Sequence, residues 1–194
     1  MRCYHLNNMY LVGIHAGIQT AHTQHELALK YLGEHSTASR RSKELYRDWA
    51  ENEKTIIVLN GGMAKHLLDF QQFLQDNESE LDLPWASFCE EEAALNGAMT
   101  NVGFVLPEHL YAFTGRILKA LDEAERRPDV LQKLEDMVYA FSGLDQGRTA
   151  LLGKFDDNLK LRVYNRDASY VTYSYNQAEI ELMRRVNALR LFGA

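Results

Sequence analysis

The sequence predicts an α/β fold in which a small mixed four-stranded sheet packs against helices and is followed by a mainly helical extension with a hairpin. Short apolar runs alternate with helical stripes over residues 9–107, in the order β-α-α-β-α-β-β. The chain has 194 residues, of which 46% are hydrophobic and 25% are charged, enough to bury a core. Amphipathic helical patterns dominate residues 108–194. We therefore expect two domains, 9–107 and 108–194.

The first strand is predicted at residues 9–14, an apolar run bounded by Asn7-Asn8 and Gly17. A helix should follow and end at Gly33. Its buried stripe is predicted from apolar spacing and comprises Ile18, Ala21, His25, Ala28 and Leu32.

The remaining elements of the first domain are predicted from the spacing of apolar residues and from the turn residues that separate the apolar runs. A second helix is expected over residues 39–51. The β-branched run at 55–59 predicts a central strand that ends at Asn60-Gly61-Gly62. The next helix carries a stripe of Met63, Leu67, Phe70 and Leu74. Strands are expected at 85–89 and 100–106, with a turn at Asn96-Gly97 between them.

The extension is predicted to begin with a helix after Pro107 and to continue with a second helix up to about residue 142. A hairpin is expected near 155–175, and a final helix starts at the capping box of Asn176 and Glu179. The helices at 108–142 and 176–192 suit either coverage of the sheet or a homodimer interface.

Charge and hydropathy limit the classes of partner. The formal net charge is −6, and residues 1–107 hold 8 Lys and Arg against 14 Asp and Glu, which disfavours nucleic-acid binding by this part. No apolar run approaches the roughly 20 residues of a spanning helix, and residues 1–20 lack the pattern of a secretory signal, so we expect a cytoplasmic protein without a membrane. Two cysteines are too few for a disulfide framework.

Three groups of residues suggest chemistry. The histidines at 15, 22 and 25 fall within eleven residues, but their spacing does not make them converge, so we expect no metal and no cofactor, with His25 buried and His22 exposed. The Asn60-Gly61-Gly62 turn precedes a helix and could bind an anion, or simply turn the chain. The run Glu90–Glu92 follows a strand and is either a general base or a solvated acidic turn.

The stretch from Tyr10 to Ala28, Tyr-Leu-Val-Gly-Ile-His-Ala-Gly-Ile-Gln-Thr-Ala-His-Thr-Gln-His-Glu-Leu-Ala, resembles the opening of the type 2 peptidyl-tRNA hydrolase family. His25 falls on the family's histidine and Gln19 on a frequent glutamine. The resemblance continues through Lys54–Leu59, the strand and acidic turn of residues 85–92, and the last strand at 95–107. It covers about residues 9–107 and is greatest to divergent members carried by bacteriophages.

The resemblance implies hydrolysis of the ester that joins a peptide to tRNA. Strand ends are the usual place for the site of an open α/β sheet. We therefore predict that Glu90 and Glu91, or neutral His15, activate a water, and that substrate is bound by Gln19, His25, Asn60, Thr100 and Asn101.

The sequence also departs from the family. Residues 14–17 form a short uncharged segment where a basic loop is usual, and Asn60 stands where a lysine is expected, which weakens the case for tRNA as a partner. The alternative is an inactive phage protein on the same fold that binds a protein partner and modulates host machinery.

Overall fold

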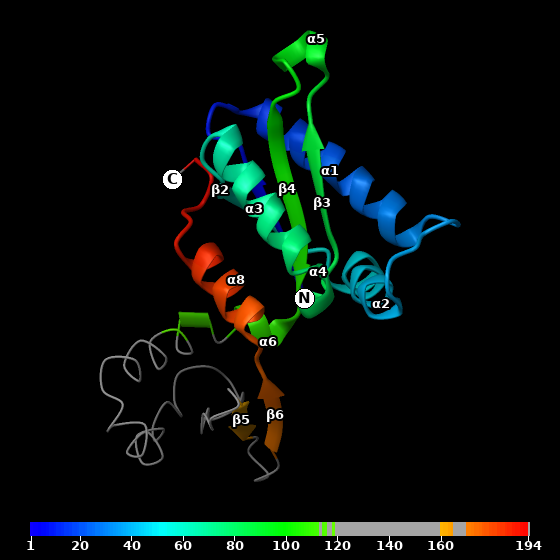
Figure 1. The fold of residues 1–194 in the computed structure, drawn as a ribbon, viewed down its shortest axis with the longest axis vertical. Coiled ribbons are helices and arrows are strands. Elements are labelled where there is room, and N and C mark those ends of the chain that lie inside the picture. Colours follow the sequence, from blue (N-terminus) through cyan, green and yellow to red (C-terminus); the bar gives the residue numbers. More distant parts are fainter. Residues whose placement is uncertain (113, 116–117, 119–159, 165–169, 194) are drawn as a thin grey trace. The chain divides into compact units, whose positions relative to one another are not determined.

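The computed structural model describes residues 1–112, 114–115, 118, 160–164 and 170–193 (Figure 1). The chain forms two compact units. The first comprises Met1–Ala112 and Arg185–Ala194, and the second comprises Phe113–Arg184. The boundary predicted near residue 107 stays a prediction.

The first unit contains the four-stranded sheet that the sequence predicts, in the order β2-β1-β4-β3. Its strands are β1 (Arg2–Asn7), β2 (Ile56–Asn60), β3 (Trp85–Cys89) and β4 (Met99–Leu106). β1 is parallel to β2, whereas β4 is antiparallel to both β1 and β3. The carboxyl ends of β1, β2 and β3 therefore share one edge of the sheet with the amino end of β4. Figure 1 shows this edge at the top, beside α5 (Glu92–Leu95).

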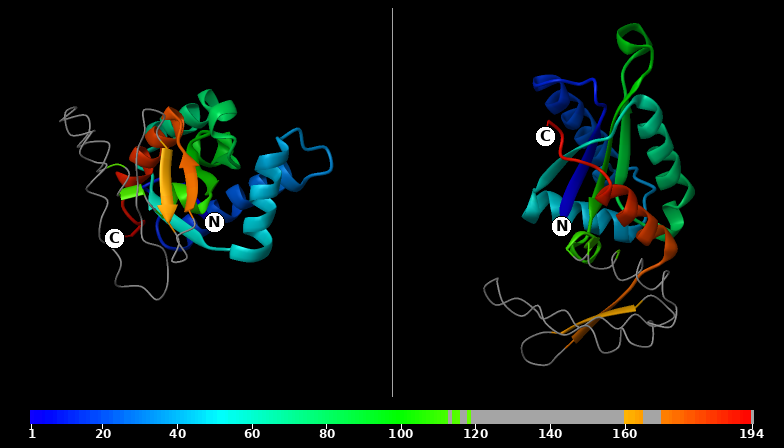
Figure 2. Two further views of the ribbon diagram at one scale, coloured as in Figure 1. Left: turned by 90° about the horizontal axis from the view of Figure 1, so that it is seen from below. Right: turned by 90° about the vertical axis from the view of Figure 1, so that its left-hand side faces the viewer.

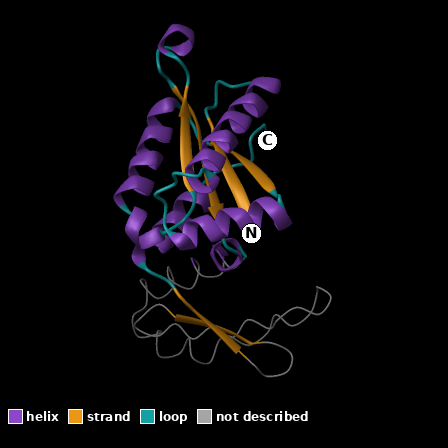
Figure 3. Ribbon diagram, turned by 90° about the vertical axis from the view of Figure 1, so that its right-hand side faces the viewer, coloured by secondary structure: helices purple, strands orange, loops and turns teal. Residues whose placement is uncertain are grey.

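Helices cover both faces of the sheet (Figures 2 and 3). One face carries α1 (Ile14–Leu32) and α2 (Arg40–Asp48), which continues as the π-helical turn η1 (Trp49–Glu53). The other face carries α3 (Ala64–Asp76), followed by α4 (Glu78–Leu81), and α6 (Glu108–Tyr111) comes after β4. Among the described residues, no helix is both long enough and apolar enough to cross a bilayer.

The core differs between the two faces. Beneath α3, Tyr4, Phe70 and Phe104 stack with ring centroids 5.4–5.8 Å apart. Beneath α1, the apolar cluster is confined to one end of the sheet and comprises Cys3, Leu27, Tyr31, Tyr46, Trp49, Ala86 and Val105. The other end of that face is polar, and this polarity explains two errors of prediction.

The first strand occupies Arg2–Asn7, and the predicted strand at 9–14 is wrong. Met9, Tyr10 and Val12 lie in an exposed loop, and Ile14 begins α1. The true strand was missed because buried polar side chains alternate along it, which removes the apolar signal that marks a central strand.

The predicted buried stripe of α1 is also wrong. Ile18, Ala21, His25 and Leu32 are exposed, and Ala28 is only half-buried. The buried face of the helix comprises Ala16, Gln19, Thr20, Thr23, Leu27 and Tyr31. Half of these side chains are polar because the sheet beneath them is polar too.

The other predicted elements of the first unit are confirmed within a few residues, including β3 at 85–89 and the turn in which Asn96 and Gly97 both have positive φ. The sequence did not predict that the last residues extend the sheet. The Asn60 amide donates to the Arg190 carbonyl (2.9 Å), and the Phe192 amide donates to the Val58 carbonyl (3.0 Å), beside β2.

The predicted hairpin of the second unit is confirmed as β5 (Lys160–Tyr164) paired antiparallel with β6 (Tyr170–Ser174). The last helix, α8, spans Gln177–Asn187 and starts at the predicted capping box. The Glu179 amide donates to Asn176 Oδ1 (2.8 Å), and the Asn176 amide donates to Glu179 Oε2 (3.0 Å). The helices predicted between 113 and 142 lie outside the described residues.

Gly103 of β4 allows α1 to approach the sheet, and this generates a prediction. A Cβ at Gly103 would lie 2.8 Å from His5 Cε1 and 2.9 Å from Thr23 Cγ2. We expect Gly103→Ala to lower the free energy of unfolding by about 1–3 kcal/mol through overpacking. Denaturant unfolding measures this change. Gly17→Ala is the control, because its Cβ would meet nothing within 4 Å and alanine favours a helix. Equal stability of Gly103→Ala and the parent would contradict the packing described.

Candidate functional site

A buried polar cluster lies between α1 and the sheet, next to the edge where β1 and β3 end. His5, Asn7, Thr23 and Asn101 are all 0% exposed, and Gln19 and Thr100 are nearly as buried. Buried polar groups are costly unless they are hydrogen-bonded. The arrangement of their partners therefore defines the site.

Hydrogen bonds run in one direction through this cluster. The Gln24 amide donates to His5 Nε2 (2.6 Å), and since an amide nitrogen can only donate, Nε2 must accept. The imidazole proton therefore sits on Nδ1, which donates to Asn101 Oδ1 (2.9 Å). The Asn101 amide in turn donates to Asn7 Oδ1. Asn7 completes the chain by donating to the Ala16 carbonyl (3.2 Å) and to Thr20 Oγ1 (3.3 Å). We call this series the relay.

The relay is uncharged. Burial lowers the pKa of His5 to about 4, although the hydrogen bond with Asn101 opposes that shift, so the imidazole is neutral at pH 7. Burial also raises the pKa of the neighbouring Cys3 thiol to about 12. Cys3 therefore stays a thiol and is a poor nucleophile. Neither side chain brings charge into the interior.

A second series of hydrogen bonds, the outer triplet, connects the interior with solvent. Thr100 Oγ1 donates to Gln19 Oε1 (2.8 Å), and Gln19 Nε2 donates to Glu90 Oε1. The backbone amide of Glu90 donates to the Ala98 carbonyl (3.1 Å). Glu90 is half-buried, whereas Gln19 and Thr100 are buried. The triplet thus holds a carboxylate at the surface by means of buried groups.

The rim of the site is apolar and aromatic. Met9, Tyr10, Val12, Ile14 and Ile18 are all more than 40% exposed. Asn8 fixes this loop to the sheet, because its amide side chain donates to the Met99 carbonyl (3.1 Å) and its backbone amide donates to the Thr100 carbonyl (2.9 Å). On the other side, His22 stacks on Phe88 with ring centroids 4.6 Å apart.

The structure brings together Gln19, Glu90, Thr100 and Asn101, four of the residues predicted from the sequence. Gln19, Glu90 and Thr100 form the outer triplet, and Asn101 belongs to the relay. Their assignment to catalysis or substrate binding stays a prediction.

The other four predicted residues lie apart from the outer triplet. His15 lies exposed in the first turn of α1, not at a strand end, because β1 stops at Asn7. His25 is exposed on the outer face of α1, which corrects the expectation that it is buried. Asn60 accepts from the Gly62 amide (2.9 Å), and Glu91 is an exposed residue before α5.

Sequence reasoning missed His5, Asn7, Asn8, Thr23 and Gln24. A signal was present: Cys3, His5 and Asn7 alternate at the period of a strand and point to one face. Gln19, Thr20, Thr23 and Gln24 recur at helical spacing. A polar strand face and a polar helix face of matching length indicate a buried hydrogen-bonded interface.

The described part of the chain holds no group of three His, Cys, Asp or Glu side chains placed to share a metal ion. A comparison of the sequence with protein-family models and with curated proteins found no match.

The neutral His5 predicts how stability depends on pH. The imidazole pKa is 6.5 in an unfolded chain and about 4 in the folded protein, so the unfolded state binds more protons between these values. Stability should be complete above pH 6.5 and fall by about 3 kcal/mol as the pH drops toward 4. Denaturant unfolding at a series of pH values measures this loss.

His5→Asn should lower stability at pH 7 but remove this part of the pH dependence. His35→Gln, which removes an exposed imidazole, is the matched control. A pH profile that is unchanged in His5→Asn would show that His5 is not a buried neutral imidazole.

Proposed function

We propose that this protein hydrolyses an ester with a water activated by Glu90, and that an ester between a peptide and the terminal ribose of tRNA is its substrate. The outer triplet is the observation that supports this proposal most directly. It holds one carboxylate at the edge of the sheet in a fixed orientation, which a general base requires.

The proposed reaction needs only protein groups and water. The Glu90 carboxylate removes a proton from a water, and the water oxygen attacks the ester carbonyl to form a tetrahedral oxyanion. Collapse of this species breaks the bond to the ribose oxygen. The protonated Glu90 returns its proton to that oxygen, which releases the ribose hydroxyl and the peptide acid.

The amino end of α1 is suited to the developing negative charge. The helix has 19 residues, and its cap, Gly13, offers no side chain to the first amides. Backbone N–H groups and the positive end of the helix dipole favour an anion at this position. The relay fixes this end of the helix to β1 because Asn7 donates to the Ala16 carbonyl.

The substrate class rests on the resemblance of residues 9–107 to type 2 peptidyl-tRNA hydrolases. The exposed apolar rim formed by Met9, Tyr10 and Val12 suits a peptide side chain or a terminal base. The acidic run at 90–92 opposes extensive phosphate contacts. An apolar rim beside an acidic run favours recognition of the substrate near its ester, with few contacts to the tRNA phosphates.

The alternative is a regulatory protein that binds a partner without catalysis. Two features favour it: the polar groups of the relay hydrogen-bond to one another, and the exposed rim combines apolar side chains with the acidic run 90–92. Such a surface would suit a protein partner that offers apolar and basic side chains. A homodimer and a partner in host machinery also stay predictions.

Release of the acyl group from N-acetylated aminoacyl-tRNA under single-turnover conditions tests the proposal. We expect the wild-type protein to accelerate release and Glu90→Gln to be slower by about 100-fold or more, because the amide cannot accept the proton. Glu91→Gln is the matched control, since it removes the neighbouring exposed carboxylate and should retain activity.

Release no faster than in buffer at any protein concentration would contradict the hydrolase and leave the binding function. Equal loss of activity in both variants would contradict the role of Glu90 as the base.

A further inference from the structure

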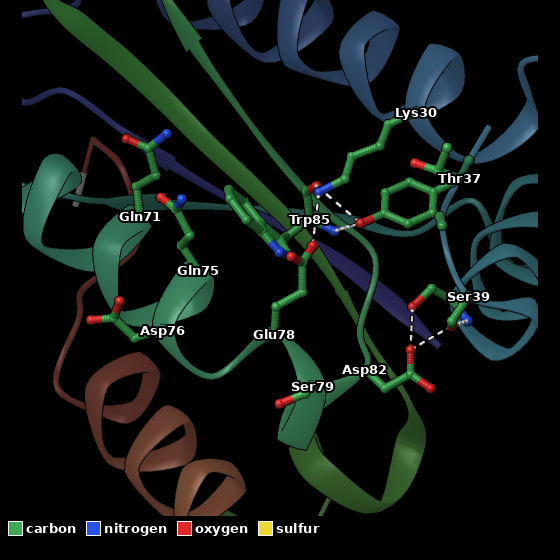
Figure 4. A pocket seen from close by; sticks show the side chains of 13 residues that line it. Lys30, Thr37, Ser39, Gln71, Gln75, Asp76, Glu78, Ser79, Asp82 and Trp85 are labelled. Carbon is green, nitrogen blue, oxygen red and sulfur yellow. Dashed lines mark hydrogen bonds and ion pairs between the residues drawn. The ribbon is translucent and has the colours of Figure 1, made fainter. Parts of the chain in front are cut away.

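A cleft lies at the opposite edge of the sheet, where β3 begins. It has a volume of about 960 Å³ and opens between the end of α1, the start of α2, and the α3–α4 segment (Figure 4). Lys30, Ser42, Gln75, Glu78, Asp82 and Trp85 are among its lining residues. The cleft shares no residue with the relay or the outer triplet, so an inference drawn from it is independent of the proposed function.

Trp85 carries an unsatisfied donor at this cleft. The residue is 9% exposed, and its indole Nε1 is the only buried side-chain nitrogen or oxygen without a hydrogen-bond partner among the described residues. Its backbone is fully engaged: the amide donates to Tyr31 Oη (2.9 Å), and the carbonyl accepts from Lys30 Nζ (3.2 Å). Figure 4 shows the indole between Gln75 of α3 and Glu78 of α4.

The surroundings hold the indole in place. Lys30 Nζ lies 4.1 Å from the centre of the Trp85 ring, a cation–π contact, and 3.3 Å from Glu78 Oε1. Ser42 Oγ donates to Asp82 Oδ1 (2.8 Å), which orders the opposite wall. The lone N–H lies on ordered walls but is itself covered, so a ligand reaches it only by displacing a neighbouring side chain. A buried donor without a partner favours such an exchange, because the ligand then supplies the missing acceptor.

The charge of the cleft and the need for a hydrogen-bond acceptor restrict the class of ligand that could bind there. Asp76, Glu78 and Asp82 outnumber the one ammonium group, Lys30, which disfavours an anion such as phosphate. A bare metal ion or a protonated polyamine has no acceptor for the indole N–H. A neutral molecule rich in hydroxyl groups satisfies both demands, because each hydroxyl can accept from Trp85 and donate to a carboxylate or a glutamine.

We propose that this cleft binds a neutral, hydroxyl-rich ligand of the carbohydrate class through a hydrogen bond from Trp85 Nε1. The volume of the cleft is within the range of small-molecule sites, which reach about 1,000 Å³. The serine and threonine side chains on its walls add further partners for sugar hydroxyls.

Proton–nitrogen correlation spectra of the full chain test this site, because the protein has only two tryptophans and thus two indole N–H signals. Trp49 Nε1 already donates to the Thr55 carbonyl (3.0 Å) and serves as the internal control. The probes are methyl glycosides of glucose, galactose and mannose, with maltotriose as a longer probe. Inorganic phosphate and spermidine are the charged comparisons.

We expect at least one glycoside to shift the Trp85 signal saturably and leave the Trp49 signal in place. Trp85→Phe, which keeps a ring but removes the N–H, should weaken binding about tenfold or more, as seen in the remaining amide signals. Trp49→Phe is the matched control and should bind normally. The titration of the wild-type protein tests the proposed carbohydrate site even if a variant fails to fold.

Three outcomes would overturn this assignment. The first is the absence of a saturable shift with any glycoside, and the second is an equal shift of both indole signals. The third is a response to phosphate or spermidine alone, which would mean that the cleft selects charge and not hydroxyl groups.

Discussion

The relay from His5 through Asn101 to Asn7 is the constraint on which the rest of the first unit depends. Each of these side chains is fully buried, so each must keep its partner or leave a polar group unsatisfied. A shift of one residue between β1 and β4 would turn these side chains to the other face, which fixes the register. The same bonds set the rotation of α1, because Asn7 reaches the Ala16 carbonyl and Gln19 then faces Thr100 and Glu90.

Much of the fold was predictable because apolar side chains recur along most elements with the spacing of a helix or a strand. β2, β3, α3 and the capped start of α8 carry apolar stripes or standard end signals, and they form close to where the sequence places them. β1 and the buried face of α1 were not predictable by that rule, since polar groups on one element satisfy polar groups on the other. The paired polarity becomes visible only when the two segments are compared with each other. Extension of the sheet by residues near 191 depends on distant backbone pairing and has no local signal.

The candidate site was half predictable for the same reason. Glu90 and Thr100 stand at strand ends, a position that topology reveals once the strands are known. Gln19 was indicated by resemblance, and its role as the bridge between them emerges only from the rotation of α1. His15 and His25 were selected for their chemistry, but the predicted start of the helix and its predicted face were both wrong, so they lie outside the triplet.

Part of the negative charge of the first 107 residues lies at the two edges of the sheet, with carboxylates at 90–92 and in the cleft beside Trp85. Beneath α1, next to the edge that holds Glu90, the buried face of the sheet is polar but uncharged, and His5 lies at its centre. The tautomer and charge of His5 test this directly by nitrogen–proton correlation of the imidazole rings across pH. A neutral His5 ring at pH 7 with its proton on Nδ1, protonating only near pH 4, agrees with the relay. A His5 ring that is charged at pH 7, or that carries its proton on Nε2, would contradict it.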